Sequence, residues 1–139
     1  MKIIRFEVDG EIRLGVLDGD DAVDLIDALE SAGPLSAEER AIVADTTAFI
    51  AAGPRGRESA ERALEISQKS NVGRKPRSGL RLRAPLRPEV ILCSGENYWD
   101  HRDEKPEVEG REPEFFTKVT QGVIGPDDDI LLDRVVTKK

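Results

Sequence analysis

Hydrophobic and charged residues alternate along the first part of the chain. In residues 4–8 every second side chain is apolar, which is the pattern of a strand with one buried face. The alternation resumes in residues 12–16 after Asp9-Gly10, a dipeptide that favours a hairpin turn. A second turn over residues 18–21 precedes a third short strand at residues 22–25. The pattern therefore predicts a β-meander.

Apolar residues then recur at intervals of three and four, which predicts amphipathic helices. The first covers residues 25–32 and ends before a Gly-Pro pair. A Ser-x-x-Glu capping box at residues 36–39 begins a second helix that continues to Gly53, and a third helix covers residues 57–70. A meander followed by packed helices gives this part of the chain an α+β fold.

The composition changes at residue 74. Residues 74–88 carry six positive charges, three prolines and no acidic residue. Such a segment could contact phosphates, but it has no aromatic residue for base stacking and the whole chain is acidic. We therefore expect no nucleic-acid interface, and predict an extended connection whose arginines pair with acids elsewhere on the protein.

The last third of the chain is typical of short strands and loops. The compact apolar run at residues 89–93 predicts a buried strand, and the heavily charged residues 100–114 predict a loop. Further strands are expected at residues 115–118 and 130–132, with a turn over residues 123–126. The predicted parts are an N-terminal α+β domain over residues 1–75, a basic linker over residues 76–88 and an incomplete second domain over residues 89–139.

Composition narrows the functional classes. The net charge is −7, from 21 basic and 28 acidic residues, and hydrophobic residues make up 38% of the chain. No apolar run approaches the ~20 residues that span a bilayer, and the first residues do not resemble a signal peptide, so we expect a cytoplasmic protein without a membrane partner. The single cysteine, Cys93, and the single histidine exclude a disulfide framework and a Cys/His zinc centre. We expect Cys93 to pack in the core.

Candidate chemistry is concentrated in residues 93–104, which contain the only histidine, tyrosine and tryptophan of the chain. If residues 98–105 are helical, His101 and Glu104 lie three positions apart on one face. A carboxylate beside an imidazole orients the ring and raises its basicity, which makes a plausible general base. Spacing alone favours the other interpretation, an exposed helix whose histidine only contacts neighbouring charges.

Several spaced elements together resemble the fumarylacetoacetate hydrolase family. They are Gly95-x-Asn97-Tyr98-x-Asp100-His101, Glu104, Phe116-x-Lys118 and Ile124-Gly125-Pro126. The resemblance implies a catalytic domain built as a mixed β-roll, a homodimer, and Mg²⁺ or Mn²⁺ as cofactor. It also implies small diketo or oxo acids as substrates.

The resemblance assigns roles to five residues. It makes His101 the general base and Glu104 its carboxylate partner, which together activate water. Asn97 and Tyr98 would shape the substrate pocket, and Lys118 would lie on its substrate side. The implied reaction is hydrolysis of C–C bonds in acylpyruvates or fumarylacetoacetate. The alternatives are an isomerase or decarboxylase of hydroxymuconate-type acids or oxaloacetate, or a non-catalytic binding and assembly module.

Two features depart from the family pattern. The family's metal-binding carboxylates are expected beyond residue 139, so we assign no metal ligand here and expect the chain to be a fragment that is inactive alone. The acidic run 127–129 follows a Gly-Pro turn and is interpreted as a solvated loop. Glu96 adds a negative charge that would disfavour an anionic substrate unless it is paired.

Overall fold

The computed structural model of the chain comprises two compact units, each of which we describe by itself. The first contains Met1–Leu86 and Ile124–Lys139, and the second contains Arg87–Val123. The structure describes residues 1–95, 98, 100, 114–133 and 135–136.

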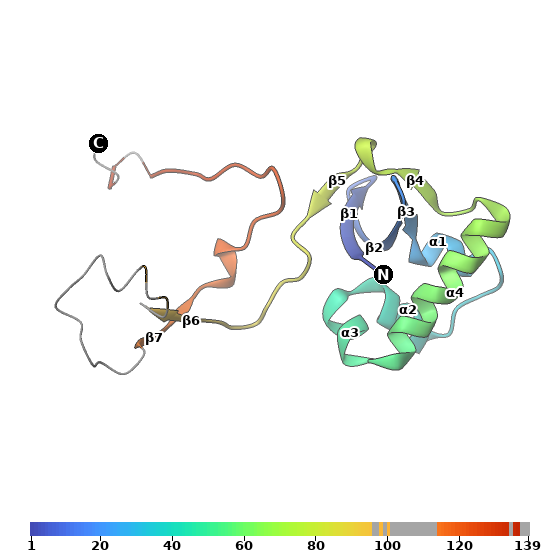
Figure 1. Cartoon of the computed structure of the whole chain (residues 1–139), viewed down its shortest axis with the longest axis horizontal. Helices are drawn as coiled ribbons and strands as arrows, with labels where there is room; N and C mark the ends of the chain where they lie inside the picture. Colours follow the sequence, from blue (N-terminus) through green and yellow to red (C-terminus); the bar gives the residue numbers. More distant parts are fainter. Residues whose placement is uncertain (96–97, 99, 101–113, 134, 137–139) are drawn as a thin grey trace. The chain divides into compact units, whose positions relative to one another are not determined.

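The first unit is built on a five-stranded antiparallel sheet (Figure 1). The strand order is β4-β3-β2-β1-β5, so the three N-terminal strands form the predicted meander. Asp9 and Gly10 turn the chain between β1 and β2 with φ angles of 51° and 82°, the left-handed conformation that Asp-Gly hairpin turns use. The strands are β1 (Ile3–Val8), β2 (Glu11–Asp18), β3 (Asp21–Asp24), β4 (Arg74–Pro76) and β5 (Arg81–Arg83).

Four helices lie together on one side of these strands (Figure 1). They are α1 (Leu25–Glu30), α2 (Ala37–Ala44), α3 (Thr46–Ala51) and α4 (Pro54–Ser70). Their apolar faces form one core with the sheet, in which Leu14, Val16 and Val23 of the strands meet Leu25 and Leu29 of α1. The predicted α+β fold is therefore confirmed for this unit.

The sequence predicted a single helix from residue 36 to Gly53. This prediction is wrong in one respect, because the structure has two helices in this region, α2 and α3. The capping box that begins α2 is present, with Ser36 and Glu39 bonded reciprocally. At Asp45 the backbone becomes extended (φ −136°, ψ 138°), and its carboxylate accepts hydrogen bonds from the N–H groups of Thr47 and Ala48 at 2.8 and 3.1 Å. An Asp that caps a new helix therefore ends the old one.

The third predicted helix is confirmed, although it begins earlier than expected. α4 begins at Pro54 and ends at Ser70, whereas the pattern predicted residues 57–70. Proline suits the first turn of a helix because the N–H that it lacks would have had no partner there. Gly56 in this turn lets α4 approach α3, since a Cβ atom on it would lie 2.5 Å from the carbonyl oxygen of Phe49.

The basic stretch contributes directly to the sheet. It forms β4, the short 3₁₀ turn η1 (Arg77–Gly79) and β5, where a simple extended connection was expected. The prediction that its cations pair with acids is confirmed. Arg74 contacts Asp18 and Asp21 at 2.5 and 3.2 Å, and Arg83 contacts Glu7 at 3.3 Å. This pairing explains how a segment so rich in positive charge can hold two strands.

The second unit contains a two-stranded antiparallel hairpin, followed by a 3₁₀ turn. Its strands are β6 (Ile91–Gly95) and β7 (Glu114–Lys118), and the turn is η2 (Thr120–Gly122). Both predicted strands are confirmed, but the strand expected at residues 130–132 is absent, since these residues have no regular structure. None of the helices that the structure describes is long and apolar enough to cross a membrane.

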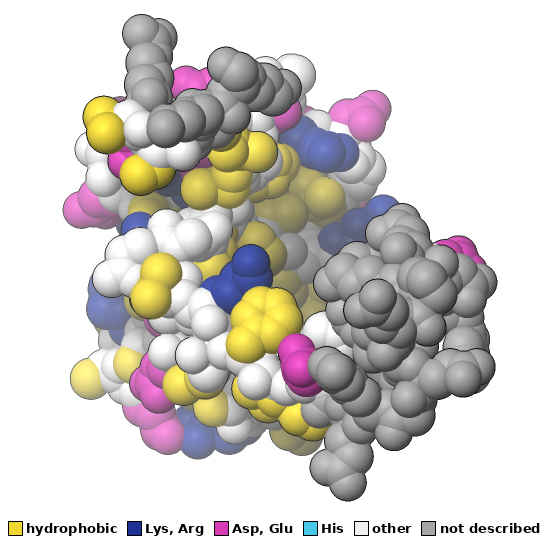
Figure 2. Space-filling view, turned by 90° about the vertical axis from the view of Figure 1, so that its left-hand side faces the viewer, with side chains coloured by type: hydrophobic (Ala, Val, Ile, Leu, Met, Phe, Trp, Pro, Cys, Tyr) yellow, Lys and Arg dark blue, Asp and Glu magenta, His cyan; other side chains and the backbone are white. Residues whose placement is uncertain are grey.

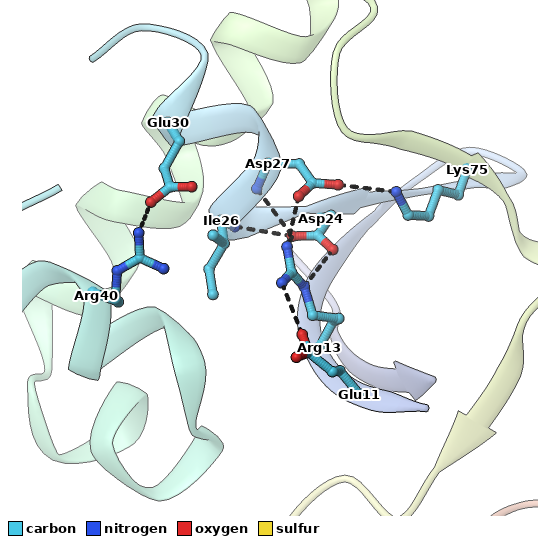
Figure 3. Close-up of polar contacts among 8 residues, drawn as sticks. All are labelled: Glu11, Arg13, Asp24, Ile26, Asp27, Glu30, Arg40 and Lys75. Atoms are coloured by element: carbon cyan, nitrogen blue, oxygen red, sulfur yellow. Dashed lines mark hydrogen bonds and ion pairs between the residues drawn. The ribbon is translucent and has the colours of Figure 1, made fainter. Parts of the chain in front are cut away.

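Arg13 and Asp24 form an ion pair where β2, β3 and α1 meet (Figure 3). Nε and Nη2 of Arg13 donate to the two oxygens of Asp24 at 3.0 and 3.2 Å, and Nη2 also reaches Asp27 at 2.6 Å. Asp24 is 1% exposed and caps α1 by accepting from the N–H groups of Ile26 and Asp27. Burial lowers the pKa of the Arg13 guanidinium, but its hydrogen bond and charge contact with Asp24 outweigh this and raise it.

Gly15 of β2 lies against the edge of the Phe6 ring, which is fully buried. A Cβ atom on residue 15 would lie 2.6 Å from Cε1 of Phe6 and 2.8 Å from the carbonyl oxygen of Val23. Both distances are far inside van der Waals contact, so only glycine fits this position.

Replacing Asp24 by alanine should destabilise the protein far more than the same change at another helix cap. Asp24→Ala removes a cap and leaves Arg13 partly buried without this partner, which costs about 3–5 kcal/mol. Asp45→Ala is the matched control, because Asp45 caps α3 through two backbone N–H groups but is exposed; its loss costs about 1 kcal/mol. Urea unfolding followed by circular dichroism measures both, and equal losses would show that the Arg13 pair adds nothing.

A methyl group at residue 15 should also be costly. Gly15→Ala forces the Phe6 ring and the Val23 backbone apart, an overpacking that costs about 1–3 kcal/mol in free energy of unfolding. Gly79→Ala is the control, because a Cβ atom there meets nothing within 4 Å. Thermal unfolding of the two variants provides the comparison, and a Gly15→Ala protein as stable as the control would contradict the close contact.

Candidate functional site

The β6–β7 hairpin holds the two ends of the segment that carries most of the candidate catalytic residues. Gly95, the last residue of β6, pairs with Glu114, the first residue of β7. The connection over residues 96–113 therefore leaves and rejoins the hairpin at directly opposite positions. A long connection that starts and ends on a paired strand end is a common place for functional side chains.

Three of the five predicted site residues, Asn97, His101 and Glu104, lie outside the described residues. Tyr98 is described, and its side chain is 78% exposed. Lys118 is the last residue of β7, opposite Ile91, so it lies four residues along the strand from the paired end of the connection. At about 3.4 Å per residue this separation is roughly 14 Å along the strand. Lys118 therefore does not lie at the Gly95–Glu114 end of the hairpin, from which the chain continues to Tyr98.

Lys118 lies over an aromatic side chain of its own strand. Its Nζ is 5.7 Å from the centroid of the Phe116 ring, a cation–π contact. Lys118 is exposed and can offer its charge to an anionic ligand.

Cys93 is paired with Phe116 across the hairpin and is half-buried. The prediction that this cysteine packs in the core is therefore wrong.

The hairpin exposes apolar side chains of both strands. Leu92 is 65% exposed, and Phe115 and Phe116 are 67% and 47% exposed. Figure 2 looks onto this part of the molecule and shows hydrophobic side chains at its surface, with basic groups among them. The expectation of a buried strand at residues 89–93 is therefore wrong for the described residues, because each strand of the hairpin has only one neighbour there.

The acidic run 127–129 was interpreted as a solvated loop, but one of its three carboxylates makes specific contacts within the protein. Asp127 and Asp129 are exposed, but Oδ2 of Asp128 accepts a hydrogen bond from the N–H of Gly125 at 2.8 Å. Its Oδ1 lies 3.2 Å from Arg81. The Gly125 N–H and then Arg81 lower the pKa of the Asp128 carboxyl group. An Asp three residues after the Gly of a Gly-Pro turn was the sequence signal for this contact.

The described residues do not form a metal site. Within the ranges that the structure describes, no three His, Cys, Asp or Glu side chains are grouped so that they could hold a metal ion. The carboxylate of Asp128 is already bonded to Gly125 and Arg81. A cavity of about 790 Å³ borders residues 126–128, η1 and β5, but none of the predicted site residues lines it.

Comparison with known protein families identifies the N-terminal part of the chain. A family model described as "Rv2993c-like, N-terminal" matches residues 1–56. This match covers β1 to β3, α1 to α3 and the first residues of α4. It lies wholly within the first unit.

Curated relatives match across most of the chain. "Oxaloacetate tautomerase fahd2, mitochondrial" of Xenopus laevis is 30% identical over 135 residues, which is 94% of this chain and 38% of the relative. "Fumarylacetoacetate hydrolase domain-containing protein 2 homolog" of Dictyostelium discoideum is 27% identical over 119 residues, 86% of this chain and 35% of the relative. "Oxaloacetate tautomerase FAHD2A, mitochondrial" of Bos taurus is 40% identical over 58 residues, 41% of this chain and 18% of the relative.

The chain thus spans less than two fifths of the length of these relatives. The family model matches residues 1–56 of the first unit, and the match to the Xenopus laevis relative includes nearly all of this sequence. The residue pattern from Gly95 to Pro126 and the relatives point to the same family. The chain therefore resembles proteins of the fumarylacetoacetate hydrolase family over most of its length.

Proposed function

We propose that the protein is an enzyme that interconverts the keto and enol forms of a small dicarboxylic oxo acid of the oxaloacetate type. The observation that carries this proposal is the 30% identity to the Xenopus laevis oxaloacetate tautomerase over 94% of the chain. Because the chain spans only 38% of that relative, the proposal concerns the protein at its natural length.

The proposed chemistry needs one base and one stabilised enolate. His101 accepts a proton from the carbon next to the ketone, and the C–H electron pair forms the C=C bond of the enolate. The former carbonyl oxygen then takes up a proton from a water molecule, and the hydroxide that this leaves recovers the proton from His101, which completes the enol and regenerates the base. Glu104, three residues after His101, orients the imidazole and stabilises its protonated form.

The remaining predicted residues bind the substrate in this proposal. Tyr98 and Asn97 form the pocket wall, and Lys118 supplies a positive charge for one carboxylate of the substrate. The exposed position of Lys118 supports this role. A four-carbon substrate is shorter than the separation along the hairpin between Lys118 and Gly95, so in this proposal the substrate binds nearer to Lys118 than to Gly95.

The family resemblance adds Mg²⁺ or Mn²⁺, which would stabilise the enolate oxygen when bound. The described residues do not fit such an ion, so no step is assigned to it here. The mixed β-roll, the metal, the homodimer and a cytoplasmic location all stay predictions.

Hydrolysis of C–C bonds in acylpyruvates or fumarylacetoacetate is the second candidate function. The Dictyostelium discoideum relative, whose name contains fumarylacetoacetate hydrolase, supports it over 86% of the chain. The same His101–Glu104 pair would then remove a proton from water, and the resulting hydroxide would attack the carbonyl carbon. The C–C bond next to that carbon would break, and the enolate that leaves would take the proton held by His101. The products separate the reactions: hydrolysis yields two acids, decarboxylation yields CO₂ and a shorter oxo acid, and tautomerisation changes no bond between carbons.

The test is the rate of oxaloacetate enolisation by the protein at its natural length, followed by the ultraviolet absorbance of the enol. His101→Gln should lower kcat by about 10²–10⁴-fold, the usual contribution of a general base. Glu104→Gln should lower it less, because Glu104 acts through His101. Release of pyruvate, measured in the same samples, should stay at the uncatalysed level.

Glu61→Gln provides the control, because it removes one exposed carboxylate from α4 and should leave kcat unchanged. An unimpaired His101→Gln enzyme would refute the assigned base. A wild-type protein that hydrolyses an acylpyruvate and does not accelerate enolisation would establish the second candidate in place of the first.

A further inference from the structure

The chain returns to the N-terminal sheet immediately after the hairpin unit. β5 is the last strand in the order of the five-stranded sheet, so its outer side has no strand neighbour among the described residues. Residues 124–128 lie against this strand. A Cβ atom on Gly125 would lie 3.2 Å from both Cα of Arg83 and N of Ala84, so the two backbones are in direct contact.

One carboxylate fastens this contact. Asp128 accepts the N–H of Gly125 within its own turn, and it also reaches Nη2 of Arg81 at 3.2 Å and Nη1 of Arg83 at 3.9 Å. Arg83 in turn contacts Glu7 of β1 at 3.3 Å. Asp128 therefore joins a charge network that extends across β5 to the next strand.

The placement of this network in the chain gives it significance beyond stability. Arg87–Val123 forms a unit of its own between two segments of the first unit, and the backbone contact of Gly125 with Arg83 and Ala84 lies just outside its two ends. Residues 85–124 are thereby closed into a loop. Closing a loop removes conformational freedom from the residues within it.

We propose that Asp128 is a positioning residue, which clasps the two ends of the hairpin unit to β5 and so limits the orientations of the unit that carries Lys118 and the candidate base. Its effect on catalysis rests on the proposed function, whereas the clasp itself does not. The exposed Arg81 pair contributes little alone, because such pairs are screened by water. The Gly125 hydrogen bond and the backbone contact supply the rest.

Hydrogen exchange of the protein at its natural length tests the clasp directly. Asp128→Ala removes both the turn hydrogen bond and the ion pair, so exchange of the amides in residues 124–128 should rise about tenfold. Asp128→Asn keeps one oxygen that can accept the Gly125 N–H, but its amide NH2 cannot accept from Arg81, so only the ion pair is lost and the rise should be about threefold. Asp127→Asn is the matched control, since it removes a neighbouring exposed charge at a positive φ that asparagine tolerates, and exchange should not change.

Steady-state kinetics with oxaloacetate separates positioning from simple loss of folded protein. A loosened unit is in its binding-competent orientation for a smaller fraction of the time, so Asp128→Ala should raise KM several-fold with little change in kcat. Loss of folded enzyme would lower kcat at unchanged KM. Two results for Asp128→Ala would each overturn the proposal. One is a lowered kcat at unchanged KM, and the other is exchange of the amides in residues 124–128 that stays within twofold of the wild type. If the wild type shows no enolisation at all, the proposed function fails, and the exchange measurement alone decides the clasp.

Discussion

The pairing of Arg13 with Asp24 is the interaction on which the N-terminal unit depends. Asp24 ends β3 and caps α1, so its carboxylate stands where the chain changes from strand to helix. A buried carboxylate is costly without a partner, and Arg13 of β2 supplies two parallel hydrogen bonds. Lys75 of β4 extends the cluster by contacting Asp27 at 3.0 Å. Three strands and the first helix are therefore linked through one charge network (Figure 3).

This network also explains why the basic stretch belongs to the sheet. β4 pairs with β3 only because the chain returns from α4 past Asn71, which adopts the left-handed conformation (φ 61°) that ends the helix. Once there, Arg74 and Lys75 meet the acids of the meander and α1. Opposite charges far apart in the sequence thus lie together, and the acids that give the chain its negative charge offset this local excess of cations.

The hairpin unit is stabilised differently. A two-stranded hairpin alone is at best marginally stable in water, and this one leaves Leu92 and Phe115 largely exposed. The chain on either side of it is anchored within the first unit, where Gly125 contacts the backbone of Arg83 and Ala84. In our proposal, this anchor limits the conformational freedom of the residues between its two ends.

Local patterns were sufficient wherever neighbouring residues decide the structure. The alternation in residues 4–8, the Asp9-Gly10 turn and the capping box at residue 36 each produced the element they predicted. Patterns failed where a choice depended on a distant partner. The periodic pattern placed Asp45 inside a helix, whereas its carboxylate caps α3. Residues 130–132 have the composition of a strand but have no neighbouring strand among the described residues.

The sequence by itself determined the meander, the three helical regions and the spaced residues that carry the family resemblance, because these depend on local propensity and on residue identity. Only the tertiary structure decided that the basic stretch completes the sheet, that residue 15 must be glycine because it contacts the Phe6 ring, and that Asp128 bonds to Gly125 and Arg81. The physical reason is that charge pairing and close packing join residues far apart in the chain. No sequence window contains both partners of such a contact.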